Sequence, residues 1–549
     1  MRWKVLSKIE DKKGQKRTEV IRKCLLVNRG LKTKKQQQEF LNPKNPYKLT
    51  LKEVGIAAAE MKKAISRIKK AIKNKEKIIV YGDYDADGIC STAIVWETLR
   101  DIGGQAMPFI PTREEGHGLK VDKIDQLADE GVKLIITVDQ GIVHSKQIAR
   151  ARKLGIDVIV TDHHVLGKKK PNAVAIIHTT QLAGVGVAWF LCRELVNIGL
   201  DLVTLGTITD MVPLLEANRS LVKYGFKELR ATKRIGLKSL YQVAGLDETK
   251  IGSYEIGFVI GPRINASGRI KDPMEPLRLL CLRRDKARAE KIAAGLSQSN
   301  RERQRLTAET VIHARKLWLE QTSQGNLIFV QDQSYHQGVI GLVAQKLSEE
   351  FYRPVVVISQ GEEESRASGR SIKEFNLIEA IRACADLLGS HGGHALAAGF
   401  TVETIKIDLV KTRLQELAEK SLGGKELAPV LKIDAEIELS DLNFAFYHQL
   451  EKLEPFGMDN HQPVFVSKQV KVVNARLVGK GKQHLSLGIE SSTGIKLKAI
   501  GFGMADFYPQ LSSEEPIDIA FNLFVNEWNG QKNLELKLKD IKLNDETKI

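Results

Sequence analysis

The amino-acid sequence predicts an α/β protein with two α/β lobes, a long helix that joins them and a small C-terminal all-β domain. Three observations predict this class. Short apolar runs alternate with helical stretches in two separate parts of the chain, a helical stretch lies between these parts, and closely spaced strand patterns fill the C-terminal part. At 549 residues the chain is also too long for one hydrophobic core.

The N-terminal segment and the first lobe differ clearly in pattern. Residues 1–75 are rich in lysine and are expected to form a basic helical segment, which ends in MKKAISRIKKAIKNK. From Lys77 onward, short apolar runs alternate with helical stretches, which indicates a parallel sheet. We therefore expect residues 76–288 to form the first lobe, with strands in KIIVYGD, VKLIITVD and IDVIVTD.

The connecting helix, the second lobe and the tail follow in that order. Residues 289–321 contain no proline or turn signal after Gly295, which predicts the long helix. Residues 322–425 repeat the alternating pattern in NLIFVQD and VVVIS, which predicts the second lobe. The short strand patterns of residues 429–549 suit a small β-barrel such as an OB-fold.

Charge and cysteine usage limit the function classes. The formal net charge is +17, which favours a polyanionic partner such as nucleic acid, although a soluble protein with a basic surface is the plainer alternative. The five cysteines lie far apart and form no CxxC pair, so neither a zinc site nor a disulfide framework is indicated. With no secretory signal and no apolar run long enough to span a membrane, we expect reduced thiols, a cytoplasmic protein and no membrane partner.

An acidic run follows the first strand of the first lobe. Asp83, Asp85 and Asp87 are spaced by two residues in YGDYDADG, directly after an apolar run. Their charges repel one another, so a cation must offset them, and carboxylate oxygens suit Mg²⁺ or Mn²⁺. The alternatives are an accidental Asp-rich turn and an EF-hand loop, but the distal glutamate of an EF-hand is missing.

The same feature recurs after later apolar runs. Asp139 follows LIITV, the triplet Asp162-His163-His164 follows DVIV, and Asp210 follows LVTLGTIT. Ligands of open α/β sheets bind at the carboxyl ends of the strands, where such residues converge. The sequence therefore predicts one metal site that hydrolyses a phosphate ester.

Four motifs carry a family resemblance. In order along the chain, GDYDADG, TVDQGI, TDHHV and LGTITDMVPL resemble the motifs of the DHH phosphoesterase superfamily, and YGDYDADG resembles its RecJ branch. The resemblance implies two Mn²⁺ or Mg²⁺ ions, with Asp139 between them and His164 at the scissile phosphate. The implied metal ligands are Asp83, Asp85, Asp87, Asp139, His163 and Asp210. For Asp162 we expect a supporting role, either orienting His163 or capping the next turn.

Further motifs resemble the substrate-binding segments of the same family. They are GPRINASGR, YHQGVIG, SGRS and GGHALAAGF, in which glycines let backbone N–H groups approach a phosphate and Arg and His supply donors. Solvated arginines in structural loops are the alternative. His117 and Tyr335 depart from the family, which usually has Tyr and Trp there. The implied substrate-binding residues are Arg113, Arg263, Asn265, Arg269, His336, Arg370, Ser371 and His394.

The tail resembles the OB-type domain of RecJ proteins. EPFG, KQHL and NEWNG carry this resemblance, and basic residues with aromatics on a small barrel suit single-strand binding. Trp528 is either part of such a surface or a core residue.

The resemblance implies a single-stranded-DNA-specific 5′-to-3′ exonuclease that releases 5′-mononucleotides in DNA repair and recombination. We expect a single-strand-binding protein and a helicase as candidate partners. A monomer is the simplest expected assembly.

Two main alternatives remain. The first is a DHH-type phosphodiesterase for short oligonucleotides or cyclic dinucleotides, against which the N-terminal extension, the connecting helix and the β-rich tail argue. The second is a non-catalytic single-strand-binding replication scaffold, against which the intact ligand set argues. An inorganic pyrophosphatase would need neither the basic charge nor the tail.

Overall fold

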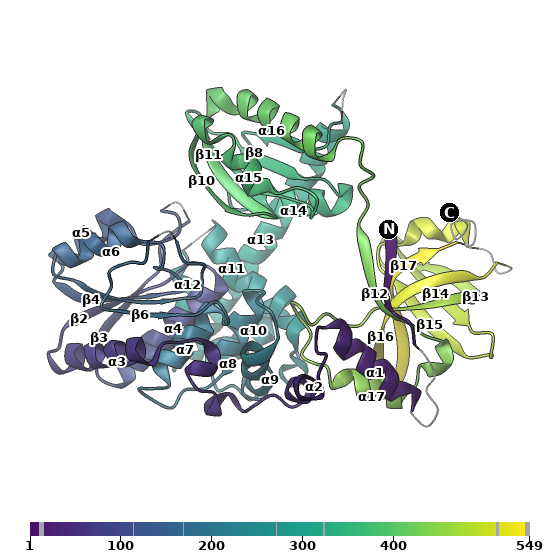
Figure 1. The fold of residues 1–549 in the computed structure, drawn as a ribbon, viewed down its shortest axis with the longest axis horizontal. Helices are drawn as coiled ribbons and strands as arrows, with labels where there is room; N and C mark the ends of the chain where they lie inside the picture. The colour runs from purple at the N-terminus through teal and green to yellow at the C-terminus, as the bar shows by residue number, and fades with distance from the viewer. Residues whose placement is uncertain are drawn as a thin grey trace. The chain divides into compact units, whose positions relative to one another are not determined.

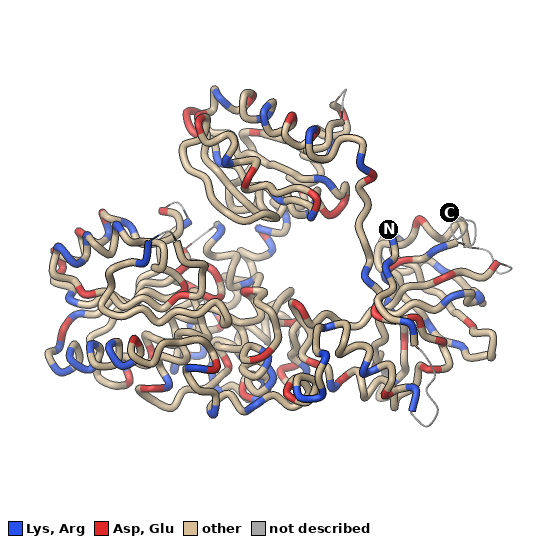
Figure 2. The backbone as a smooth tube through the Cα atoms, viewed as in Figure 1, with Lys and Arg blue, Asp and Glu red and all other residues tan. Residues whose placement is uncertain are grey.

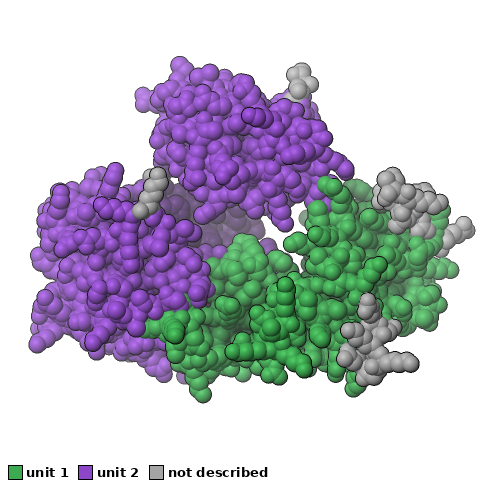
Figure 3. Space-filling view, in the orientation of Figure 1, with its two compact units in different colours: residues 1–54, 211–227, 430–549 green, residues 55–210, 228–429 purple. Residues whose placement is uncertain are grey.

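The structure, a computed structural model, contains two compact units (Figures 1 and 3). Unit 1 comprises residues 1–54, 211–227 and 430–549, and unit 2 comprises residues 55–210 and 228–429. The structure describes residues 1–9, 16–113, 115–167, 169–270, 272–321, 324–511 and 515–543. The side chain of Trp528 lies outside the described part. Its expected role, either on a stacking surface or in the core, therefore stays a prediction.

The first lobe of unit 2 is built on a five-stranded parallel sheet with the order β3-β2-β4-β5-β6. Helices cover both faces, with α5 and α6 on one side and α3, α4 and α7 on the other (Figure 1). The strands are β2 (Lys77–Tyr81), β3 (Gln105–Phe109), β4 (Val132–Val138), β5 (Asp157–Asp162) and β6 (Ala175–His178). The helices are α3 (Ala58–Lys73), α4 (Ala86–Asp101), α5 (Val121–Asp129), α6 (Ser145–Lys153), α7 (Gly184–Cys192) and α8 (Asp201–Thr209).

The alternation of side chains along each strand explains this layering. Ile79 and Tyr81 of β2 and Ile135 of β4 pack with the apolar residues of α5 and α6. The intervening residues Ile78 and Val80 are also fully buried. Parallel strands buried on both faces give the continuous apolar runs seen in the sequence. The parallel sheet is therefore confirmed, and its carboxyl edge gathers the residues that follow β2, β4 and β5.

A long helix links the first lobe to the second, as predicted. It is α13 (Lys286–Leu319), which begins after Asp285, whose side chain accepts a hydrogen bond from Arg288 N at 3.0 Å. The elements before it are α9 (Glu216–Arg230), α10 (Ile235–Ala244), the π-helix η4 (Glu255–Ile260), α11 (Gly261–Ile270) and α12 (Met274–Cys281).

The second lobe contains a mixed five-stranded sheet with the order β10-β11-β9-β8-β7. Only β7 and β8 pair in parallel among the described strands of this sheet, and the other pairs are antiparallel. The strands are β7 (Ile328–Asp332), β8 (Val355–Ser359), β9 (Glu364–Arg370), β10 (Leu388–His394) and β11 (Ala397–Glu403). The helices are α14 (Ile340–Phe351), α15 (Leu377–Arg382) and α16 (Ile407–Leu422).

Unit 1 is mostly β-structure around its own core. Its sheet has the order β1-β12-β13-β14-β15-β17-β16, and β16 also pairs with β13. The OB-type barrel itself stays a prediction. The strands are β1 (Arg2–Ser7), β12 (Val430–Glu436), β13 (Phe465–Val478), β14 (His484–Glu490), β15 (Lys496–Gly501), β16 (Ile517–Trp528) and β17 (Gln531–Lys542). The helices are α1 (Arg17–Asn28), α2 (Lys34–Leu41) and α17 (Phe444–Glu451).

The structure corrects the prediction that residues 1–75 are helical throughout. Strand β1 (Arg2–Ser7) pairs in parallel with β12 at the edge of the sheet of unit 1. Most of its side chains are exposed, so the alternation that marks a half-buried strand is weak.

Basic residues are spread over both units (Figure 2). Within the described part of the chain, no helix combines the length and the apolar character that a membrane span requires.

Candidate functional site

The acidic run after β2 is organised by the start of α4. Asp85 is the N-cap of this helix, and its Oδ1 accepts a hydrogen bond from Gly88 N at 2.9 Å. The buried Asp87 lies in the first turn and accepts hydrogen bonds from Gly184 N at 2.7 Å and Val185 N at 2.9 Å. These donors form the N-terminus of α7, where the partial positive charge of the helix favours a carboxylate.

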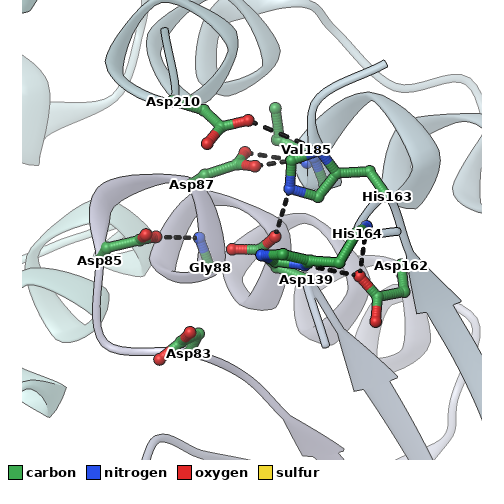
Figure 4. A network of polar contacts seen from close by, with 12 residues as sticks. Asp83, Asp85, Asp87, Gly88, Asp139, Asp162, His163, His164, Val185 and Asp210 are labelled. Carbon is green, nitrogen blue, oxygen red and sulfur yellow. Dashed lines mark hydrogen bonds and ion pairs between the residues drawn. The ribbon is translucent and has the colours of Figure 1, made fainter. Parts of the chain in front are cut away.

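Four acidic and histidine side chains converge beside Asp87 (Figure 4). His163 Nε2 lies 3.2 Å from Asp139 Oδ1, and His163 Nδ1 lies 3.7 Å from Asp210 Oδ2. Two groups of possible ligand atoms result, Asp87 with His163 and Asp210, and Asp139 with His163 and His164. In each group the ligand atoms lie within 4.8 Å of one another, and His163 belongs to both.

The local backbone is shaped to bring these carboxylates close together. Asp139 has a positive φ of 60°, which is rare for a residue with a side chain and typical of functional sites. A Cβ on Gly184 would lie 2.5 Å from Asp139 Oδ1, and a Cβ on Gly206 would lie 2.8 Å from Asp87 Oδ1. Glycine is therefore required at both positions.

The electrostatics of the cluster call for a cation. Burial, followed by the charges of Asp87 and Asp85, raises the pKa of Asp210 to about 9 and the pKa of Asp139 well above its ordinary value. Burial and the neighbouring Asp83 and Asp87 raise the pKa of Asp85 to about 6. Burial lowers the pKa of His163, which favours the neutral imidazole that binds metals.

Two oxygens of the cluster also lack a partner. Among the described residues, the buried atoms Asp139 Oδ1 and Asp210 Oδ2 have no hydrogen-bond partner. Buried polar atoms rarely remain unsatisfied. Carboxylate oxygens beside a neutral imidazole are the ligands that Mn²⁺ and Mg²⁺ take, so the residues present fit divalent cations.

Asp162 holds His164 in place. Its Oδ1 accepts from His164 N at 3.0 Å and lies 2.8 Å from His164 Nδ1, while its Oδ2 accepts from Ile142 N at 2.8 Å (Figure 4). Burial alone would raise the pKa of Asp162, but the hydrogen bond and charge of His164 outweigh it and lower this pKa. The same hydrogen bond raises the pKa of His164. Of the two roles expected for Asp162, the hydrogen bond from His164 N fits capping of the next turn, and the imidazole that Asp162 contacts is His164.

Asp83 and Asp85 lie beside the two ligand groups. Asp83 Oδ1 accepts from Tyr84 N at 2.7 Å, and Asp83 Oδ2 lies 2.8 Å from His117 Nδ1. Neither carboxylate supplies an atom to the two groups, although both raise the pKa of Asp139. Sequence reasoning treated His117 only as a departure from the family and missed its contact with Asp83.

The structure also corrects the placement of Asp210. The segment LVTLGTIT before it is the helix α8, and Asp210 is the C-cap of this helix. A short buried helix that is apolar on all sides has the same pattern as a buried strand. Asp210 thus reaches the site from a helix end.

Four arginines form a second cluster, which we call the arginine cluster: Arg113, Arg269, Arg303 and Arg370. Burial, followed by the charges of the other three, lowers the pKa of Arg269 to about 10. Arg303, on α13, was missed by the sequence analysis. Among the described residues, the buried Nε atoms of Arg113 and Arg303 have no hydrogen-bond partner. Neighbouring half-buried guanidinium groups with buried, unsatisfied N–H donors favour an anion such as a phosphate.

Two members of the arginine cluster, Arg113 and Arg269, line a cleft of about 850 Å³ in unit 2, whereas Arg303 and Arg370 do not line it. Its lining includes Arg113, Arg269, His336 and Arg366, with Asp272 as its carboxylate. Arg269 Nη1 donates to Gly338 O at 3.0 Å, which ties α11 to the loop after β7.

The other predicted substrate residues do not line this cleft. Arg263 donates to Ser297 Oγ and Val259 O, and Ser371 donates to Phe375 O. Asn265 Oδ1 accepts from Ala86 N at 2.7 Å, next to Asp85 and Asp87. His394 is exposed at the end of β10. Tyr335, which stands where the family usually has Trp, is buried beside His313 and does line the cleft.

Three family models match the chain. The DHH family N-terminal domain matches residues 77–207, the DHHA1 domain matches residues 324–420, and the RecJ OB domain matches residues 433–540.

Curated relatives and solved structures extend this similarity over most of the chain. The single-stranded-DNA-specific exonuclease RecJ of Bacillus subtilis (strain 168) is 35% identical, over 98% of this chain and 70% of the relative. The protein of that name from Escherichia coli (strain K12) is 33% identical, over 88% of this chain and 90% of the relative. The crystal structure of RecJ with Mn²⁺ from Thermus thermophilus matches with a TM-score of 0.83 and 28% identity, over 98% of this chain and 79% of that chain.

Proposed function

Because the chain belongs to the RecJ family of single-stranded-DNA-specific exonucleases, we propose that it hydrolyses single-stranded DNA from the 5′ end and releases 5′-mononucleotides. The observation that carries this proposal is the convergence of Asp87, Asp139, His163 and Asp210 at the edge of the parallel sheet. The substrate is inferred from the family, and the hydrolytic chemistry is inferred from these four side chains.

We further propose that Mn²⁺ or Mg²⁺ serves as cofactor, as two ions. Asp87, His163 and Asp210 would hold one ion, and Asp139 with His163 would hold the other, with Asp83 and Asp85 supporting the set. Bound divalent cations activate water and neutralise the charge that develops on a phosphodiester. The raised pKa of His164 favours its protonated form, which suits a phosphate contact better than a metal contact.

The arginine cluster supports a role in holding the DNA backbone. Arg113, Arg269, Arg303 and Arg370 offer several N–H donors, Asp272 of the cleft pairs with Arg278 instead, and phosphate groups accept such donors in pairs. Arg113 and Arg269 line a cleft that also includes Gly268, and a Cβ on Gly268 would lie 2.6 Å from the carbonyl oxygen of Tyr84 in the acidic motif. We propose that the arginine cluster binds the terminal phosphate, which would set the polarity.

Further proposals rest on the family and on the sequence expectations given above. They are a role in DNA repair and recombination, a cytoplasmic location, a monomeric state, and a single-strand-binding protein and a helicase as partners. We also propose residues 76–288, 289–321, 322–425 and 429–549 as domains, whereas the expected segment 1–75 is divided between unit 1, to residue 54, and unit 2, from residue 55.

One assay tests the function. The protein is incubated with Mn²⁺ and with single strands labelled at the 5′ or the 3′ end, with duplex and with a dinucleotide. The proposal predicts that the 5′ label appears at once in mononucleotide, while the 3′ label remains on progressively shorter strands. Cleavage of the dinucleotide while long strands survive would instead indicate a short-oligonucleotide phosphodiesterase, and binding without cleavage would indicate a scaffold.

A further inference from the structure

The cleft of unit 2 is larger than a single phosphate group needs. Its volume is about 850 Å³, and Arg113 and Arg269 of the arginine cluster form only part of its lining. Cavities of roughly 300–1,000 Å³ hold whole small-molecule ligands. The remaining lining comes from the loop after β7 and from the strands β8 and β9, and it includes Ser334, His336, Ser359 and Arg366.

Arg366 is a cationic position separate from the arginine cluster. Burial alternates along β9, and Arg366, Ser368 and Arg370 share its less buried face. At about 3.3 Å per residue, the Cα atoms of Arg366 and Arg370 lie roughly 13 Å apart. Arg370 belongs to the arginine cluster, so β9 presents two arginines in line, and the second of them lines the cleft.

The carboxylates nearest to Arg366 in the cleft and on β9 are turned to other groups. Asp272 of the cleft pairs with Arg278 at 2.9 Å. Glu364, two residues before Arg366 on β9, lies beside Gly389, where an added Cβ would be 3.5 Å from Glu364 Oε1. Within the described ranges of the chain, no ion pair of Arg366 is found, and its side chain is half-buried. A half-buried guanidinium in this state favours an anionic ligand.

His336 offers a second donor in the same cleft. Gly338 N donates to His336 Nδ1 at 2.9 Å, so a neutral ring carries its proton on Nε2. The hydroxyls of Ser334 and Ser359 already donate to other groups of the protein. The donors that remain for a ligand here are therefore the imidazole of His336 and the guanidinium of Arg366.

We propose that this cleft accepts 5′ ends that carry a triphosphate. The arginine cluster binds the phosphate attached to the first nucleotide, and Arg366 and His336 bind the two phosphates beyond it. The inference rests on the proposed function and names a further substrate class for the same site. A triphosphate supplies the additional negative charge and acceptor oxygens that a second group of donors in the cleft requires.

The proposed reaction gives a distinctive first product. Water attacks the phosphorus between the first and second nucleotides, and the bond from this phosphorus to the 3′ oxygen of the first nucleotide breaks. The water supplies the new oxygen on phosphorus and, in net balance, the proton on the 3′ oxygen. The first nucleotide leaves as a nucleoside 5′-triphosphate, and the remaining strand carries a 5′ monophosphate. Every later product is a 5′-monophosphate.

The first test compares three single-stranded 12-mers that carry a 5′ hydroxyl, monophosphate or triphosphate. Initial rates of release of the first nucleotide are measured with Mn²⁺, and the products are separated by ion-exchange chromatography. The wild type should release a nucleoside triphosphate from the third strand. Arg366→Ala should lower kcat/KM for this strand by about tenfold or more and leave the monophosphate strand unaffected. Arg382→Ala, which removes an exposed arginine at the end of α15 in the same lobe, is the matched control.

The second test measures binding without metal or cleavage. The affinities of the same strands, labelled at the 3′ end with fluorescein, are measured by anisotropy in EDTA. The wild type should bind the triphosphate strand more tightly than the monophosphate strand, and Arg366→Ala should bind both equally.

Three results would overturn the inference. They are cleavage of the monophosphate strand but not of the triphosphate strand, an equal loss on both strands in Arg366→Ala, and equal wild-type affinities for both strands. If the wild type cleaves none of the strands, the proposed function fails, and the binding comparison in EDTA still decides this inference.

Discussion

At the scale of single residues, the site combines mutually repelling carboxylates with mutually repelling arginines. Asp87, Asp139 and Asp210 approach one another because glycines and a helix N-terminus leave room for their oxygens. The charge of Arg303 lowers the pKa of Arg269, and no carboxylate is among the causes that shift the pKa of Arg269 or of Arg303. Each cluster is costly alone and is stabilised by a ligand of opposite charge.

The metal-free protein should lose stability as pH rises. The pKa of Asp210 is raised from 3.8 to about 9 by burial and by Asp87 and Asp85. Between these values the folded protein keeps a proton that the unfolded chain releases, so the free energy of unfolding falls with rising pH. Thermal denaturation in EDTA should show Tm falling from about pH 5.5 to 8.5 more steeply than in Asp210→Asn, and Mn²⁺ should raise Tm most at high pH. Equal slopes for the two proteins would contradict this account.

Arg303→Ala should raise KM for single-stranded DNA by about tenfold or more, since a hydrogen bond to a charged group contributes about 1.5–3 kcal/mol. Tm should not fall, because the variant removes a half-buried cation whose Nε has no hydrogen-bond partner among the described residues. The matched control is Arg305→Ala on the same helix, whose guanidinium pairs with Glu302 and Glu309. KM of both variants is measured by steady-state kinetics with a 5′-phosphorylated single strand. A wild-type KM for Arg303→Ala would show that Arg303 is not part of the phosphate site.

The sequence predicted the converging carboxylates and histidines better than it predicted the arginine cluster. The converging residues are Asp87, Asp139, His163, His164 and Asp210. Asp87, Asp139 and His163 follow strands of one parallel sheet, so spacing alone indicates that they converge. Arg303 lies among other charged residues of a long helix, and only the fold shows that its Nε is buried. The contact of Asp162 with His164, two residues away, depends on loop conformation that no periodicity encodes.

At the scale of elements, the packing of α7 against the end of β4 sets the geometry of the site. Gly184 begins α7, donates its N–H to Asp87 and leaves space for the carboxylate of Asp139. Helix α8 brings Asp210 to the same point from its C-terminus. The apolar pattern of α8 resembles a buried strand, so pattern alone could not distinguish the two.

Gly184→Ala should reduce Mn²⁺ affinity, because the added Cβ would lie 2.5 Å from Asp139 Oδ1 and would push this carboxylate away. We expect a loss of tenfold or more in affinity, about 1.4 kcal/mol, and a parallel loss of cleavage. Gly295→Ala on α13 is the matched control, since its Cβ would meet nothing within 4 Å and alanine favours a helix. Isothermal titration with Mn²⁺ compares the affinities of the two variants. Equal affinities would show that the contact between the Cβ at position 184 and Asp139 does not affect Mn²⁺ binding.

At the scale of the whole molecule, the sequence predicted the α/β lobes and the long helix, which are strongly patterned. It missed that β1 belongs with strands more than 400 residues later in the chain, because a short exposed edge strand has almost no pattern. No pattern in the sequence predicts that residues 211–227 belong to unit 1. The net charge of +17 is spread over both units, so it indicates a polyanionic partner without locating its binding surface (Figure 2).

The central claim is that the converged carboxylates and His163 form the metal centre that cleaves single-stranded DNA. The most direct test measures Mn²⁺ binding by isothermal titration and cleavage of a 5′-labelled single strand over the same Mn²⁺ range, for the wild type and Asp139→Asn. The account predicts that wild-type cleavage follows Mn²⁺ occupancy, and that Asp139→Asn loses Mn²⁺ affinity and cleavage together while remaining folded. Cleavage in EDTA, or undiminished cleavage by Asp139→Asn, would contradict it.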